Sequence, residues 1–152
     1  MQKRAEINTA LKEALKKQDK LVVSTLRLVL AAVKDKDISA FGQGRPEGID
    51  DSEILSLLQS MIKQRQDSSK QYRDAKRDDL ADKEDAEVEI IRGYLPKQLS
   101  ETEIEQAVGA IITETGAAGI RDMGKVMGVL KARYAGQMDM GQAGAIVKKK
   151  LG

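Results

Sequence analysis

Apolar residues recur every three or four positions along most of the chain, which is the period of an amphipathic α-helix. In residues 2–17 they are Ile7, Leu11, Ala14 and Leu15, and lysines occupy the other side. Residues 20–36 leave little polar face, so we expect them to form the central helix of the first half, capped by Asp19. Residues 38–49 lack periodicity and contain three glycines and a proline, which predicts a loop.

Two further helices complete the first half. Asp50 or Asp51 is placed to start a helix that runs to about Ala75, with Glu53 completing a capping box. A fourth helix is predicted over residues 80–94, with Asp78 or Asp79 as its N-cap.

A short break follows at residues 93–100. Pro96 lacks a backbone N–H and disfavours helical geometry at Leu95, so the fourth helix must end there. Ser100 and Glu103 form the capping-box pattern that starts the next helix. We therefore expect a tight joint between the two halves.

The second half is predicted to contain three helices, at about 101–115, at about 122–134, and from a start framed by Asp139 and Gln142 to Leu151. Gly116 lies where a left-handed C-cap is expected, and Asp139 precedes the last helix. The predicted fold class is all-α, with an N-terminal four-helix domain over 1–95 and a small three-helix domain over 97–152.

The composition excludes several chemistries. The 152 residues include no cysteine and no histidine, so disulfides, thiolate nucleophiles, zinc sites with nitrogen or sulfur ligands and imidazole catalysis are absent. No glycine cluster follows a strand in the manner of a nucleotide-binding loop. We expect no cofactor, no metal and no catalytic residue.

The first twenty residues and the longest apolar stretch bear on the cellular compartment. Residues 1–20 alternate in charge without the apolar core of a signal peptide. The apolar stretch of residues 21–33 is interrupted by polar residues and is too short to cross a bilayer. We therefore predict a cytoplasmic protein without a membrane partner.

Two charged features inside the first half have alternative interpretations. Arg27 lies in the apolar second helix, where it either snorkels or forms a structural ion pair, or instead binds a ligand. The fourth helix carries an acidic cluster that is either a solvated face or a divalent-metal site. Lysine and arginine interspersed in it favour the solvated face. The cluster consists of Asp82, Glu84, Asp85, Glu87 and Glu89.

Positive charge gathers at the C-terminal end, where residues 120–152 carry only two acidic side chains, Asp122 and Asp139. The basic ones are Arg121, Lys125, Lys131, Arg133, Lys148, Lys149 and Lys150. They either contact RNA phosphates or are simply solvated, with the last lysines favoured by a helix dipole. Gly124 and Gly128 allow close approach of a backbone, either that of a neighbouring helix or that of a nucleic acid.

Five blocks in order resemble the YqeY-type proteins of the GatB/YqeY family. The blocks are residues 24–28 (STLRL), 62–65 (IKQR), 84–87 (EDAE), 94–99 (YLPKQL) and 122–128 (DMGKVMG). The second half is then similar to the tail domain of the B subunit of the tRNA-dependent amidotransferase. This resemblance implies a cytoplasmic bacterial protein of two helical domains, the second similar to a tail that helps the amidotransferase grip the body of the tRNA.

Carried over by position, the resemblance indicates Arg121, Gly124, Lys125, Lys131 and Arg133 as RNA-binding residues, to which the charge pattern adds Lys148 and Lys149. The leading hypothesis is a non-catalytic accessory protein that associates with tRNA or other structured RNA. The second is a helical adapter that binds a protein partner in aminoacyl-tRNA metabolism. The third is a carbon–nitrogen ligase with glutamine as amide donor, although the chain lacks the cysteine, histidine and phosphate loop that such chemistry ordinarily uses.

Overall fold

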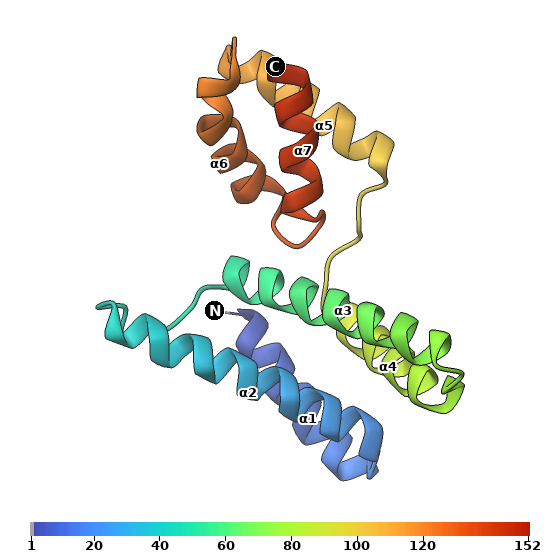
Figure 1. The fold of residues 1–152 in the computed structure, drawn as a ribbon. Coiled ribbons are helices and arrows are strands. Elements are labelled where there is room, and N and C mark those ends of the chain that lie inside the picture. Colours follow the sequence, from blue (N-terminus) through green and yellow to red (C-terminus); the bar gives the residue numbers. More distant parts are fainter. Residues whose placement is uncertain (1) are drawn as a thin grey trace. The chain divides into compact units, whose positions relative to one another are not determined.

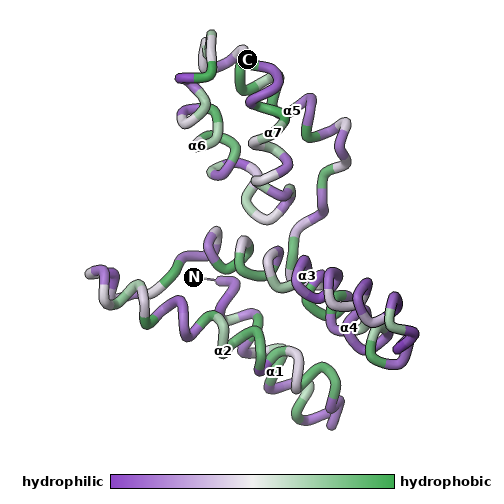
Figure 2. Tube along the Cα trace, in the orientation of Figure 1, coloured by the Kyte–Doolittle hydropathy of each residue, from purple (hydrophilic) through white to green (hydrophobic). Residues whose placement is uncertain are grey.

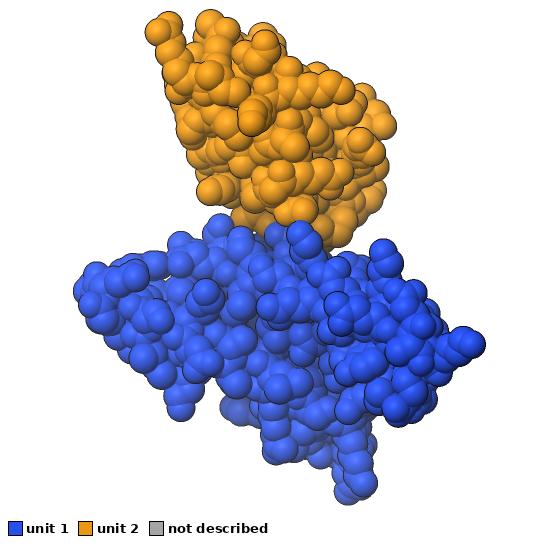
Figure 3. Space-filling view, in the orientation of Figure 1, with its two compact units in different colours: residues 1–95 blue, residues 96–152 orange. Residues whose placement is uncertain are grey.

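The computed structural model describes residues 2–152, and it confirms the all-α fold class. The described residues form seven α-helices and one short 3₁₀ helix and contain no strand (Figure 1). They gather into two compact units, residues 1–95 and 96–152 (Figure 3). That each unit folds as a domain of its own stays a prediction. No helix in the described part of the chain is long and apolar enough to span a membrane.

The first unit contains α1 (Gln2–Lys17), α2 (Lys20–Gly42), α3 (Asp51–Asp74) and α4 (Asp78–Arg92). Hydrophobic and hydrophilic residues are interspersed along each helix, and the hydrophobic stripes meet in one core (Figure 2). This burial is the main force that holds the four helices together. The side chains in the core that are fully buried include Ile7, Leu26, Ile54, Leu58 and Ile91.

Helix α2 is longer than predicted, because residues 38–42 continue it instead of belonging to the loop. Asp37, the residue directly before this extension, accepts hydrogen bonds from the Ile49 N–H (2.8 Å) and from the Arg4 guanidinium (2.6 Å). These bonds join the end of α2 to the start of α1 and to the residues that precede α3. Gly48 must lie close to the Asp37 carboxylate, and it adopts a φ of 79°.

The N-terminal caps follow the predictions in most cases. Asp19 accepts a hydrogen bond from Val22 N–H, and Asp50 and Glu53 form the predicted capping box of α3. The prediction for α4 is wrong, because its N-cap is Arg77, and neither Asp78 nor Asp79 caps it. Both carboxylates instead lie inside the first turn, where the helix dipole favours them.

Arginines of α3 pair with the acidic cluster of α4. Arg65 donates to Glu87 (2.9 Å), and both side chains are nearly buried. Arg73 donates to Asp82 (2.9 Å) and Asp85 (2.7 Å) at the exposed end of the helix pair. Three of the cluster's five carboxylates therefore serve to dock α4 on α3.

The joint at residues 93–100 contains no helix, as Pro96 predicts. Its last residues are bound to the second unit, since Leu99 N–H donates to the Gln137 carbonyl (2.8 Å) and the Gln98 amide donates to the Gly136 carbonyl. Ser100 and Glu103 form the predicted capping box of α5.

The second unit contains α5 (Glu101–Thr115), the 3₁₀ helix η1 (Ile120–Asp122), α6 (Met123–Tyr134) and α7 (Met140–Leu151). Gly116 closes α5 with the predicted left-handed φ of 67°, and Asp139 caps α7. A second core forms between these helices, and its fully buried members include Val108, Ile111, Val126, Leu130 and Val147.

Candidate nucleic-acid interface

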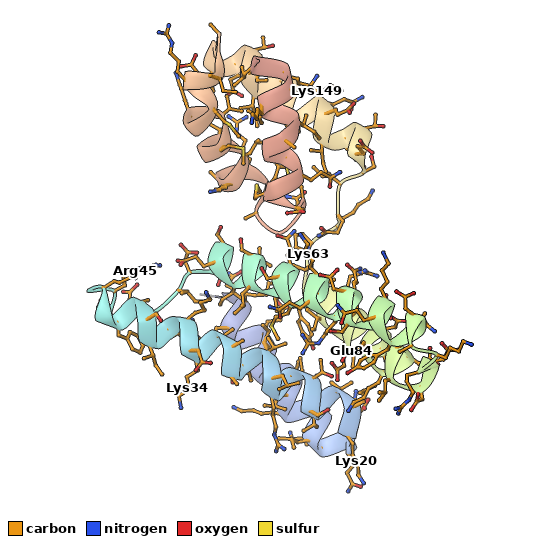
Figure 4. The ribbon with its side chains drawn as sticks, in the orientation of Figure 1. Lys20, Lys34, Arg45, Lys63, Glu84 and Lys149 are labelled. Carbon is orange, nitrogen blue, oxygen red and sulfur yellow. The ribbon has the colours of Figure 1, made fainter. Side chains whose placement is uncertain are left out.

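The C-terminal end of α7 lies at the same end of the second unit as the α5–α6 connection (Figure 1). This arrangement brings the three terminal lysines, residues 148–150, to the end of the unit where Arg121 and Lys125 also lie, and all five are exposed. Figure 4 labels Lys149, which lies on α7. Lys131 and Arg133 belong to the last turns of α6, about 9–12 Å beyond Lys125 along the helix. The predicted site residues therefore form two groups.

Gly124 and Gly128 are exposed, and a Cβ added at either position would meet no atom within 4 Å. Within the second unit, the interpretation of this pair as a site of close helix packing is therefore wrong. The glycine that lies close to another helix is Gly144 of α7, where an added Cβ would lie 3.7 Å from the Met123 methyl group of α6. Sequence analysis missed Gly144 because a single glycine in a short helix has no distinctive spacing.

One exposed face of α6 joins the open glycines to two cations. Arg121, Gly124, Gly128 and Lys131 follow one another at intervals of three, four and three, so they share one side of the helix and of the turn before it. We call these four residues the glycine face. Neither Arg121 nor Lys131 forms an ion pair within residues 2–152.

Two of the predicted RNA-binding side chains are engaged with α5 instead. The Arg133 guanidinium donates to both Glu114 oxygens, at 2.7 and 2.5 Å. These hydrogen bonds lower the pKa of Glu114 and raise that of Arg133, so both groups stay ionised and neutralise each other. Lys125 Nζ donates to the Thr115 carbonyl at 3.2 Å.

Asp122 organises the turn that leads into the glycine face. Its carboxylate accepts a hydrogen bond from Ala118 N–H at 2.9 Å, and this bond lowers the pKa of Asp122 below its ordinary value. The positive charges of Arg121 and Lys125 act in the same direction. Asp122 therefore holds the loop before α6 and offsets one positive charge there.

The chain belongs to the family of Yqey-like proteins, whose family model matches residues 4–151. It is similar to two fungal proteins with the same name, "Altered inheritance of mitochondria protein 41, mitochondrial". That of Lachancea thermotolerans is 34% identical over 112 residues, which are 72% of this chain and 58% of the relative. That of Pyrenophora tritici-repentis is 32% identical over 129 residues, which are 84% of this chain and 68% of the relative.

These relatives correct two expectations. The prediction of a cytoplasmic, bacterial protein is wrong, because the relatives are fungal and are named mitochondrial. The cytoplasmic prediction rests on residues 1–33 as well as on the five blocks, and the bacterial prediction rests on the blocks alone; neither pattern is specific to one compartment or organism. The relatives' names also give no support to an amidotransferase or carbon–nitrogen ligase relationship.

Proposed function

We propose that this protein is a non-catalytic accessory protein whose second unit binds the sugar-phosphate backbone of structured RNA, with tRNA as the first candidate. The observation that carries the proposal is the glycine face, where two glycines leave the backbone of α6 open between two cations. A phosphate group can approach such a surface closely, and Arg121 and Lys131 supply the attraction that dominates nucleic-acid binding.

The choice of RNA also draws on sequence resemblance. The likeness of residues 97–152 to the amidotransferase tail domain stays a prediction, and it suggests tRNA as the ligand. The relatives' names refer to mitochondria, so mitochondrial tRNA is to be tested beside bulk tRNA. Within the predicted site, Arg121, Lys131, Lys148 and Lys149 are expected to contribute more than Lys125 and Arg133, whose side chains are held by α5.

The test measures tRNA binding to the intact chain by fluorescence anisotropy at low and near-physiological salt. The double variant Arg121→Glu/Lys131→Glu should weaken binding and reduce the slope of log K against log salt by about 2, since each lost phosphate contact removes about one counterion. The control is Lys12→Glu/Lys70→Glu, which makes the same charge change at exposed sites of α1 and α3. Equal losses in the two double variants, or no binding at low salt, would refute the proposal.

A further inference from the structure

Helix α2 exposes an unusual amount of apolar surface. Six large hydrophobic side chains are exposed among the described residues, and four of them lie on α2: Leu21 (36%), Leu28 (49%), Ile38 (55%) and Phe41 (51%). The opposite side of the same helix already supplies the buried Leu26, Val29 and Val33 to the core. The exposed apolar residues are therefore not needed to hold the unit together.

The exposed residues of α2 follow the spacing of a helix-docking seam. Alternating steps of three and four residues connect six exposed positions, which we call the α2 seam: Leu21, Ser24, Leu28, Ala31, Asp35 and Ile38. This is the spacing of the a and d positions of a coiled coil. The small Ser24 and Ala31 leave recesses between the larger residues, into which side chains of a second helix can insert.

A column of cations runs along one side of the seam. Lys20, Arg27 and Lys34 are spaced by seven residues, are exposed, and form no ion pair within residues 2–152. Figure 4 shows Lys20 and Lys34 projecting from the same side of α2, away from α3. The opposite flank is uncharged, with Thr25 buried, Ala32 partly buried and Ser39 exposed. Arg27, whose role the sequence left open, thus belongs to this column as an exposed side chain.

We propose that the α2 seam binds an amphipathic helix of a partner protein that carries carboxylates at seven-residue intervals. Flanking charges of this kind determine which helix pairs with which, and the cation column calls for an acidic partner. A second copy of the chain fits less well. An antiparallel pair of α2 helices would set the column against itself, and a parallel pair would set it against the uncharged flank.

An anionic membrane surface also fits less well than a helix. Asp35 lies within the seam itself, where a bilayer would have to desolvate a carboxylate near its own negative charge. A partner helix can place a lysine or arginine opposite Asp35. The proposal concerns residues 20–42 alone and is independent of RNA binding by the second unit.

Two synthetic peptides of three heptads test the proposal with the intact chain. Both carry leucine and alanine at the seam positions, and they differ only in having glutamate or lysine at the flanking positions. Fluorescence anisotropy should show at least about tenfold tighter binding of the acidic peptide at low salt, with a smaller difference at high salt because exposed charges are screened. Equal binding of the two peptides, or binding of neither, would overturn the proposal.

Substitutions in α2 and α1 locate the site. Leu28→Asp should abolish binding of the acidic peptide, whereas Leu15→Asp, at a position of similar exposure on α1 (45%), should leave it unchanged. Both positions are solvent-exposed, and circular dichroism checks that each variant is folded. Arg27→Glu/Lys34→Glu should reverse the preference, so that the basic peptide binds more tightly.

Three other results would overturn the proposal. One is an equal loss of binding in Leu15→Asp and Leu28→Asp. The second is binding to phosphatidylserine vesicles that Leu28→Asp abolishes while neither peptide binds. The third is self-association, seen by sedimentation, that depends on Leu28 and competes with the peptide. The last two would assign the seam to a membrane or to a second copy of the chain.

Discussion

Replacing Gly128 by alanine separates a structural from a ligand-binding role for the open glycines of α6. Gly128 lies in the helix interior, and the added methyl group would meet no atom within 4 Å. Alanine favours a helix interior over glycine by about 1 kcal/mol. Gly128→Ala should therefore raise the free energy of unfolding by about 1 kcal/mol.

The expected change in melting temperature depends on how the chain unfolds. With an unfolding entropy of about 2.1 cal/mol/K per residue, 1 kcal/mol corresponds to about 3 °C when all residues unfold together. It corresponds to about 8 °C when the second unit melts alone. Calorimetry therefore measures the stabilisation and also tests whether residues 97–152 form a separate domain.

The same methyl group occupies the surface where an RNA phosphate is proposed to approach. Gly128→Ala should therefore weaken tRNA binding while it stabilises the fold. Gly109→Ala is the matched control, because Gly109 lies inside α5 with equally open surroundings and outside the glycine face. It should raise stability without changing RNA affinity. A destabilised Gly128→Ala would refute the packing argument, and an unchanged affinity would refute the placement of RNA on this face.

Three further predictions concern the first unit. Gly48→Ala should lower the free energy of unfolding, measured in urea, by about 2–4 kcal/mol, because alanine is strained at positive φ and its Cβ would collide with the Asp37 carboxylate. An unchanged free energy of unfolding would contradict this. Glu87→Ala should lower the free energy of unfolding by about 3–5 kcal/mol, because it leaves the charge of the nearly buried Arg65 without its partner. Adding Arg65→Met should recover much of that loss of stability. Glu53 has a pKa lowered from 4.5 to about 2, chiefly by hydrogen bonds from a neighbouring arginine. Its contribution to stability is therefore complete above pH 4.5 and lost as the pH falls toward 2, and Glu53→Gln should remove that part of the acid sensitivity.

Local sequence signals predicted the helices and most of their caps. Ser100 and Glu103 are three residues apart, and a capping box needs only that spacing to form. Two other helix ends gave no such signal. Gln18 and Lys76 adopt left-handed conformations, with φ of 56° and 59°, where glycine is the usual residue. Local backbone hydrogen bonds close both turns, from Asp19 N–H to the Ala14 carbonyl (3.1 Å) and from Arg77 N–H to the Tyr72 carbonyl (2.8 Å), and such bonds do not depend on the side chain.

The candidate surfaces were only partly predictable for the same reason. The charge of residues 120–152 is visible in the sequence, but the pairing of Arg133 with Glu114 requires two helices to meet. The α2 seam was not recognised because residues 38–49 were predicted to be a loop, which removed its last position, Ile38, from the helix. An apolar residue in a helix has the same spacing whether it faces a core or a partner, so exposure has to come from the fold.

The Asp37 carboxylate joins three parts of the first unit that are distant in the chain, and this has a consequence for engineering. The bonds from Arg4 and Ile49 hold the two ends of the α2–α3 connection, while Gly44 at its tip is exposed and its surroundings are open. Lengthening or cutting a turn whose ends are already held has a small entropic cost. Gly44 is therefore a suitable position for a reporter domain, a protease site or the new termini of a permuted chain, because α2 and α3 keep their relative positions.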